Sequence, residues 1–434
     1  MVTHFPRWTN AGIVTLAMLL VGSIWLQAGR IAESRGLGYD GEIYAAMTTQ
    51  GLDAGGDNAR MRPLVILLNR VMYGVTAPDV IGAFQLMNVV YAALLAWVLC
   101  AILDLYGVSS AHKIVFTLNV FATIAVTKMF AFYPVLIDLG AYLFVALAVY
   151  SILRGNRLWI VVATLLAVFA REFGLVVILF GVHRDLRLRV RLPMVAATYA
   201  PALAAFIALR QWVIATSPEA SGVAAIQGGL VSAGDIAANL SRGGWLFPVF
   251  FAYFTAAVFG GISILLVLRA LRGRLRLGGE TEWITYLGCL GLLTLAGPDV
   301  WRYLAYGVPA VAALYAGNLA AENWRLVAPW SALLTAFTQR PWVRMNDTSF
   351  FEDWLPLYLP QFGIPDPPTP EFWLRWSVRG AVVIGIAMLA WMAQRPAPTA
   401  GGVRLATEGD WRILGPWGGL VTVMFMQAVN VVRV

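Results

Sequence analysis

Long apolar runs separated by short polar stretches dominate the chain. The first run covers residues 11–28, and many others follow it. Those further runs are 80–103, 114–132, 139–153, 158–170, 173–182, 193–214, 245–268, 283–296, 303–321, 326–337, 377–393 and 413–429. Several are shorter than the roughly 20 residues that a helix needs to cross a bilayer, so some must be broken, tilted or covered by protein. The pattern predicts an all-α polytopic membrane protein with roughly 11–13 transmembrane helices.

Two stretches break this rhythm. Residues 63–75 are apolar but short, and they carry Arg70, which predicts an interfacial helix lying along the membrane in the first outer loop. Residues 347–376 are rich in proline and aromatics, which indicates a loop anchored at the membrane surface. We therefore divide the chain into a transmembrane domain, 1–338, and a C-terminal region, 339–434, with this loop and two further apolar helices. The side on which segments after residue 325 lie stays open, because the run 326–337 is weak.

Composition supports the membrane setting. The chain is 60% hydrophobic and only 12% charged, whereas a soluble domain is about 25% charged. The net charge of +8 comes largely from basic residues in short loops, so it indicates orientation in the membrane rather than nucleic-acid binding. Cys100 and Cys289 both lie inside apolar runs, which predicts neither a disulfide framework nor a zinc site.

The positions of the basic residues predict which loops share a face. Basic loops of membrane proteins lie on the cytoplasmic side. The segments expected there are the N-terminus, 154–157, 184–191 and 269–276. The loops expected on the outer face are 30–79, 133–138, 215–244 and 298–302.

The stretch 158–182 must then leave the cytoplasm and return to it. We expect two short helices meeting at Arg171-Glu172, with that turn on the outer face. The alternative is one continuous helix with an intramembrane Arg-Glu pair, which would place the 184–191 cluster outside. The strong basic bias on both sides of the stretch favours the hairpin.

Unusual charges collect on the outer face in this arrangement. The candidate site residues are Asp40, Glu42, Tyr44, Arg60, Arg62, Asp138, Arg171, Glu172, Asp299 and Arg302. Ionisable groups at such a membrane boundary generally handle a substrate, an ion or a proton. Simpler interpretations remain open for each member. Asp40 could cap a helix, and Glu42 could be a first-turn residue that the helix dipole favours. The Arg-Glu and Asp-Arg turns could hold structural ion pairs. Arg60 and Arg62 could anchor lipid headgroups.

Three short motifs in this order resemble bacterial glycosyltransferases of the GT-C type. Tyr39-Asp40-Gly41-Glu42-Ile43-Tyr44, followed by Arg60-Met61-Arg62-Pro63-Leu64, resembles the first outer loop of that family. Ala170-Arg171-Glu172-Phe173-Gly174-Leu175 is similar to its turn between two short helices, and Asp299-Val300-Trp301-Arg302-Tyr303 to a later Asp-x-x-Arg turn. Asn88 also fits the pattern. The resemblance covers roughly residues 10–320, and Glu42 departs from it, because relatives often carry an uncharged residue there.

The resemblance implies a multi-pass enzyme of the bacterial inner membrane, with its active site on the periplasmic face. Such enzymes move a sugar from a polyprenyl-phosphate carrier to an acceptor hydroxyl on a glycan, lipid or protein. Asp40, or Glu42 beside it, would be the base of an inverting single displacement. Arg60, Arg62, Arg171 and Arg302 would hold the carrier phosphate, and Tyr44, Asp138, Glu172 and Asp299 would bind the sugar or orient the arginines.

Two rival functions remain. A transporter or flippase for a lipid-linked or anionic solute would use the same charges, although such proteins often carry internal repeats and none is found here. A non-catalytic assembly subunit could keep the fold without the activity. The outer-loop carboxylates would also suit a divalent cation, but no ligand spacing requires one. The sugar, the acceptor, the carrier length and the oligomeric state are not specified by the sequence.

Overall fold

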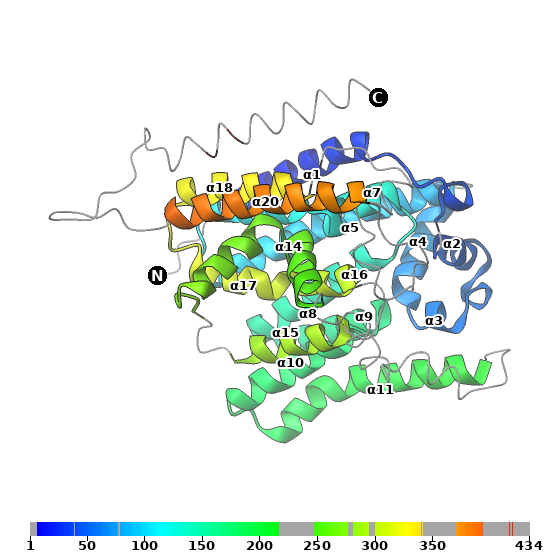
Figure 1. Cartoon of the computed structure of the whole chain (residues 1–434). Helices are drawn as coiled ribbons and strands as arrows, with labels where there is room; N and C mark the ends of the chain where they lie inside the picture. The colour runs from blue at the N-terminus through cyan, green and yellow to red at the C-terminus, as the bar shows by residue number, and fades with distance from the viewer. Residues whose placement is uncertain are drawn as a thin grey trace.

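The computed structural model describes residues 7–38, 40–76, 79–216, 247–276, 281–294, 300–339, 341, 370–393, 416 and 419 of the 434-residue chain. Helices account for nearly all of this described part, which contains no strand. Figure 1 shows the long helices running side by side, with α2, α3 and α4 gathered at one end of the bundle. The all-α class expected from the apolar runs is confirmed for the described part of the chain.

The helices follow the predicted runs closely in the first half of the chain. These are α1 (Arg7–Ala28), α2 (Gly41–Gln50), α3 (Asp57–Arg60), α4 (Pro63–Thr76), α5 (Val80–Leu105), α6 (Ser110–Phe121), α7 (Met129–Phe132), α8 (Asp138–Arg154), α9 (Arg157–Ala170), α10 (Gly174–Arg187) and α11 (Leu192–Thr216). Short elements η1 (Glu33–Gly36), η2 (Leu52–Ala54) and η3 (Ile124–Lys128) lie between them. Polar side chains cap several starts: Asp79 accepts from the Gly82 amide, and Asn156 from the Trp159 amide.

The second half contains α14 (Phe247–Leu271), α15 (Glu282–Thr294), α16 (Val300–Ala305), α17 (Val308–Asn318), α18 (Trp324–Gln339) and α20 (Pro370–Ala393). The predicted run 303–321 is not one helix, because it divides into α16 and α17 around Tyr306 and Gly307, with Pro309 in the first turn of α17. The predicted loop 347–376 is described only from residue 370 onward, and there the prediction is wrong, because residues 370–376 form the first turns of α20. The run 413–429 lies outside the described residues apart from 416 and 419.

Three described helices are long and apolar enough to cross a membrane: α1 from Thr9, α5 and α11. A fourth span is formed if α6 and the segment Ile124–Phe132 count as one, although they bend by 62° at their junction. Several shorter apolar helices accompany them. The described part of the chain therefore has the character of a multi-pass membrane protein, in which α5 is the most buried of the three long spans.

The bend corrects the expectation of a single helix over 114–132. Polar side chains from the distant α18 accept the backbone amides that the breaks leave free. Gln339 accepts the Ile124 amide at 2.9 Å, and Thr335 accepts the Gly261 amide at 2.7 Å where α14 bends at Gly260. Asn119 joins this network through Thr335. Breaks inside a membrane protein need such partners, because water is not available there.

The expected hairpin at Arg171-Glu172 is confirmed. α9 ends at Ala170 and α10 begins at Gly174, with extended backbone at Arg171 between them. Arg157 at the start of α9 pairs with Asp185 near the end of α10, so the two helices run in opposite directions. Gly174 is required at the turn, because a Cβ atom there would lie 2.6 Å from the Ala167 carbonyl carbon. The single continuous helix is therefore excluded.

Polar contacts tie together the helix ends that were expected to share the basic face. Asn10 of α1 donates to Asp104 of α5, and Lys113 of α6 reaches both. Arg269 of α14 pairs with Glu322, whose carbonyl also contacts His112. At the other end of the bundle, the Ile31 amide donates to the Phe132 carbonyl and Arg60 to Thr216. The candidate site lies at this second end, beside α2 and α4 (Figure 1).

Candidate functional site

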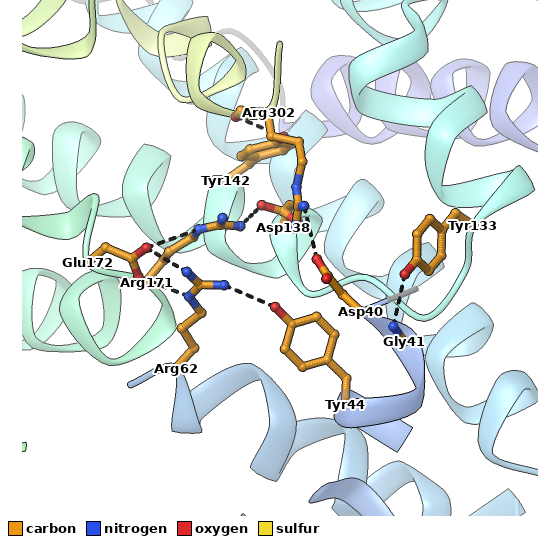
Figure 2. Close-up of polar contacts among 10 residues, drawn as sticks. All are labelled: Asp40, Gly41, Tyr44, Arg62, Tyr133, Asp138, Tyr142, Arg171, Glu172 and Arg302. Carbon is orange, nitrogen blue, oxygen red and sulfur yellow. Dashed lines mark hydrogen bonds and ion pairs between the residues drawn. The ribbon is translucent and has the colours of Figure 1, made fainter. Parts of the chain in front are cut away.

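Seven of the predicted residues come together in one place. They form the arginine–carboxylate cluster: Asp40, Tyr44, Arg62, Asp138, Arg171, Glu172 and Arg302. Figure 2 shows them converging from the start of α2, the segment before α4, the start of α8, the α9–α10 turn and α16. Hydrogen bonds and ion pairs connect all seven, with the Arg171–Glu172 ion pair joining the two halves, although Asp40 and Arg302 are 262 positions apart.

Asp138 is the buried centre of the cluster. Its carboxylate has no exposed surface and lies at the start of α8. Arg302 donates to Oδ2 from Nη2 at 2.6 Å and from Nε at 3.0 Å, and Arg171 pairs with Oδ1. Both guanidinium groups are almost fully buried. Two arginines sharing one buried carboxylate hold α8, α16 and the α9–α10 turn in a fixed relation.

Asp40 lies at the exposed edge of the cluster. It precedes α2, where an aspartate commonly caps a helix, but its side chain makes no capping hydrogen bond. The Gly41 amide donates to the Tyr133 hydroxyl instead, at 2.9 Å. The Asp40 carboxylate, half exposed, accepts from Arg302 Nη1 at 3.3 Å. The capping interpretation is therefore wrong, and the carboxylate is available to a ligand.

Tyr133 supports the backbone on both sides of Asp40. Its ring lies so close to Gly38 that a Cβ atom there would approach it to 2.4 Å, and Gly38 has a φ of +75°. Burial, reinforced by the Asp40 carboxylate, raises the pKa of Tyr133, so its hydroxyl stays protonated at neutral pH. Asn88 of α5 donates to the Pro134 carbonyl next to it at 2.8 Å and steadies the loop.

Arg62 and Glu172 form the second exposed edge. Arg62 donates to Oε2 from Nε at 3.1 Å and to Oε1 from Nη2 at 2.8 Å, a two-bond fork. Its Nη1 donates to the Tyr44 hydroxyl at 3.0 Å. Burial alone would raise the pKa of Glu172, but Arg62 and Arg171 outweigh it and lower that pKa to about 2. Glu172 is therefore ionised at neutral pH.

Arg171 lies between these two edges. One end of its guanidinium pairs with Asp138, and its face lies over the rings of Phe173 and Tyr303, at 5.7 and 5.8 Å. Its Nε is buried and donates no hydrogen bond within the described structure. The nearest carboxylate oxygen, Glu172 Oε1, lies 3.8 Å away, beyond hydrogen-bonding distance.

Three other candidates lie elsewhere or outside the described residues. Arg60 is buried, donates to the Thr216 side chain at 2.5 Å and carbonyl at 3.3 Å, and lies over the Trp212 ring. It fastens α3 to the end of α11. Glu42 is exposed in the first turn of α2 and makes no contact with the cluster among the described residues. Asp299 lies outside the described residues.

Two tyrosines of the site were not anticipated. Tyr133 supports the Asp40 backbone, and Tyr142 donates to the Arg302 carbonyl at 3.2 Å. Tyr133 belongs to the outer loop 133–138 that the charge pattern assigns to the same face as Asp40. That shared face was the available signal. Tyr142 lies one turn into α8, within an apolar run, and nothing in the sequence distinguishes it from the ordinary core aromatics.

The charges of the cluster balance, since Arg62, Arg171 and Arg302 oppose Asp40, Asp138 and Glu172. The balance is uneven in space, because the Asp138 end is closed and the Asp40 and Glu172 carboxylates are 50% and 34% exposed. Among the described residues, no group of three or more His, Cys, Asp and Glu side chains could hold a metal ion. The site can offer a reachable base beside guanidinium donors for an anion.

Comparisons with known proteins add no assignment. No protein-family model matches the chain, and neither a curated protein nor a solved structure matches it.

Proposed function

We propose that this protein is a GT-C-like membrane glycosyltransferase that moves a sugar from a polyprenyl-phosphate carrier to an acceptor hydroxyl. The observation that carries the proposal is the position of Asp40. Its carboxylate is half exposed and makes no helix-capping hydrogen bond. It lies beside Arg302, which the buried Asp138 holds in place. The transfer is an inverting single displacement, in which Asp40 takes the proton of the attacking hydroxyl.

The chemistry needs a base and an anion site close together. The acceptor oxygen attacks the anomeric carbon, the bond to the carrier phosphate breaks, and the hydroxyl proton passes to Asp40. Only Oδ2 of Asp40 accepts from Arg302, and Oδ1 accepts no hydrogen bond from a described residue. The leaving phosphate carries the developing negative charge, which guanidinium donors stabilise.

The arginines divide into two groups by burial. Arg302 is committed to Asp138 and Asp40, so we assign it to holding the base. Arg62 and the Nε edge of Arg171 face the partly exposed Glu172 and suit the carrier phosphate. Arg60 is already committed to Thr216 and leaves the set of phosphate ligands. Glu42 remains the second candidate for the base because it is exposed and lies two residues after Asp40.

The membrane arrangement supports a lipid-linked donor. We infer roughly 11–13 spans in the whole chain, as the apolar runs indicate, with the cluster at the periplasmic face of a bacterial inner membrane. A polyprenyl chain stays in the bilayer and its phosphate lies at the surface, so the site must lie at that boundary. The α4 helix beside Arg62 exposes Leu67, Val71 and Val75 along one side, which suits an interfacial position.

A transporter or flippase is the second candidate, and the broken helices α6 and α14 are the observation that favours it, since transporters bind solutes at such breaks. Here, however, Gln339 and Thr335 already occupy the freed backbone amides. The helix breaks therefore have a structural explanation, and we favour the enzyme over the transporter.

The decisive assay separates transfer from transport. Purified protein in nanodiscs is given a panel of polyprenyl-phosphate sugars with envelope glycans and lipids as acceptors, and release of free polyprenyl phosphate is followed. Transfer predicts acceptor-dependent release. Movement of intact donor across proteoliposomes, with no polyprenyl phosphate formed, would replace the enzyme by the transporter. Asp53→Asn is the matched control for the site variants, because the Asp53 side chain is 91% exposed and its one polar partner among the described residues is Arg60, outside the cluster.

A further inference from the structure

Glu172 lies where an anionic ligand would be expected. Its carboxylate meets Arg62 through two nearly parallel hydrogen bonds, at 2.8 and 3.1 Å. Carboxylates and phosphates both bind arginine in this forked manner. A carboxylate in such a position can be the fixed partner of the arginine, or it can occupy the place of a ligand. The surroundings of Glu172 distinguish the two.

The first distinguishing observation is exposure. The Asp138 carboxylate, which is a fixed partner, has no exposed surface, whereas the Glu172 side chain is 34% exposed and Arg62 is 15% exposed. Glu172 is also in the short turn between α9 and α10 rather than within a helix. Its side chain can therefore move away without disturbing the buried contacts of Asp138.

The second observation is an incomplete contact. Arg171 Nε is buried and donates no hydrogen bond to a described residue, and Glu172 Oε1 stops 3.8 Å short of it while bonding to Arg62. A buried donor without an acceptor is costly. A carboxylate has two oxygens, and both are already used by Arg62. A phosphate has additional oxygens and could reach Arg62 and Arg171 Nε together.

The third observation is charge. The cluster is neutral with Glu172 in place, so a phosphate added to it would meet no excess positive charge. If Glu172 swings out toward solvent, Arg62 and Arg171 face the phosphate without a competing carboxylate. The phosphate of a sugar-bearing carrier is a diester with a single negative charge, so its exchange for the Glu172 carboxylate keeps the charge of the site balanced.

We propose that Glu172 is a stand-in for the carrier phosphate, which holds Arg62 in the empty site and is displaced when the phosphate head of the lipid carrier binds. This inference rests on the proposed function for the identity of the ligand. It names Arg62 and Arg171 Nε as the phosphate ligands and makes Glu172 a competitor rather than a sugar-binding residue. Donor affinity is then set by the competition.

The test measures binding of farnesyl phosphate, which carries no sugar, to the full chain in nanodiscs. Glu172→Gln keeps the shape of the side chain and removes its charge, and it should tighten binding by about tenfold or more. Asp53→Asn removes one negative charge from the same end of the protein and should leave binding unchanged. Farnesol, which lacks the phosphate, should bind both variants and the parent alike.

Several results would overturn the inference. Unchanged or weaker binding by Glu172→Gln removes the competition, and equal tightening by Asp53→Asn shows only a general charge effect. Equal tightening for inorganic phosphate would identify an anion site without lipid preference and would overturn the assignment to a carrier.

A density map of the unmodified protein with farnesyl phosphate covers the case in which Glu172→Gln does not fold. The phosphate should lie between Arg62 and Arg171 with Glu172 turned away. A phosphate elsewhere, no bound phosphate, or an intact Arg62–Glu172 fork beside the phosphate would contradict the inference. None of these readouts uses sugar transfer. Failure of the proposed enzyme activity therefore leaves the binding result standing, and failure of the binding result leaves the activity standing.

Discussion

Arginine–carboxylate ion pairs lie at both ends of the α9–α10 hairpin, but they have different roles at the two ends. At the open end, Arg157 pairs with Asp185, and Arg184 and Arg187 both donate to Glu282 at 2.8 Å. We call these the open-end ion pairs. At the turn, Arg171 and Glu172 enter the arginine–carboxylate cluster. The open-end carboxylates are buried, with 7% and 0% of their side chains exposed, whereas Glu172 is 34% exposed and Asp40 50%.

This difference in exposure distinguishes structural ion pairs from a candidate functional site. The open-end ion pairs join α9 to α10 and α10 to α15, and no carboxylate is left within reach of a ligand. The cluster at the turn also has a buried part, Asp138 with its two arginines, but it adds two reachable carboxylates at the edge. Counting ion pairs would rank the two ends alike. Exposure of the acidic partner is what indicates function.

The largest effect on stability is expected at the buried centre of the cluster. Asp138→Asn leaves Arg171 and Arg302 buried without their shared charge, which should cost about 3–5 kcal/mol of unfolding free energy. Thermal unfolding in detergent measures this loss. Glu282→Gln, at the open end, should also destabilise the protein but leave farnesyl phosphate binding unchanged. Parental stability of Asp138→Asn would show that the buried pairings are not as described.

A smaller effect is expected from the support of the Asp40 backbone. Tyr133→Phe leaves the buried Gly41 amide without its acceptor, at a cost of about 1–3 kcal/mol. Turnover should fall while farnesyl phosphate binding is kept, since Arg62 is untouched. The matched control is Tyr150→Phe, because the Tyr150 hydroxyl on α8 makes no hydrogen bond to a described residue. An equal loss in both variants would remove the positioning role of Tyr133.

The smallest effect is expected at the open end. Arg187→Gln leaves Arg184 on Glu282, and Arg187 is 31% exposed. The change should cost less than about 1 kcal/mol, as is usual for ion pairs near the surface. Thermal unfolding and transfer should both stay near parental values. A strong loss of transfer with normal stability would mean that the open end takes part in the function, and the comparison between the two ends would collapse.

Most helices and the hairpin could be predicted from the sequence, because apolar length and basic loops are local signals. The assignment of 30–79, 133–138 and 298–302 to one face also placed Asp40, Asp138 and Arg302 at a common end before any contact was known. The bends in α6 and α14 could not be predicted in this way. Their free backbone amides donate to Thr335 and Gln339 from the distant α18. A hydropathy pattern does not identify hydrogen-bond partners so far away in the sequence.

The pairing within the site was also beyond the sequence. Adjacent in the chain, Arg171 and Glu172 suggested a local ion pair, and they do form one, but only a loose one at 3.8 Å without a hydrogen bond. Arg171 pairs with Asp138 and Glu172 with Arg62, which is 110 positions away. Neighbouring side chains in an extended turn point in different directions, so the tertiary packing decides their partners. The partner of Arg60 could not be predicted either, because only the fold shows that its guanidinium already donates to Thr216.

The central claim is that Asp40 performs the chemistry while the arginines bind the carrier. The most direct measurement is turnover by Asp40→Asn with a polyprenyl-phosphate sugar, alongside farnesyl phosphate affinity and thermal stability. The substitution keeps the shape and removes the basicity, so turnover should fall by about 10²–10⁴-fold, with affinity and stability near those of the parent. Near-parental turnover would contradict the account, and Glu42→Gln would then test the neighbouring carboxylate as the base.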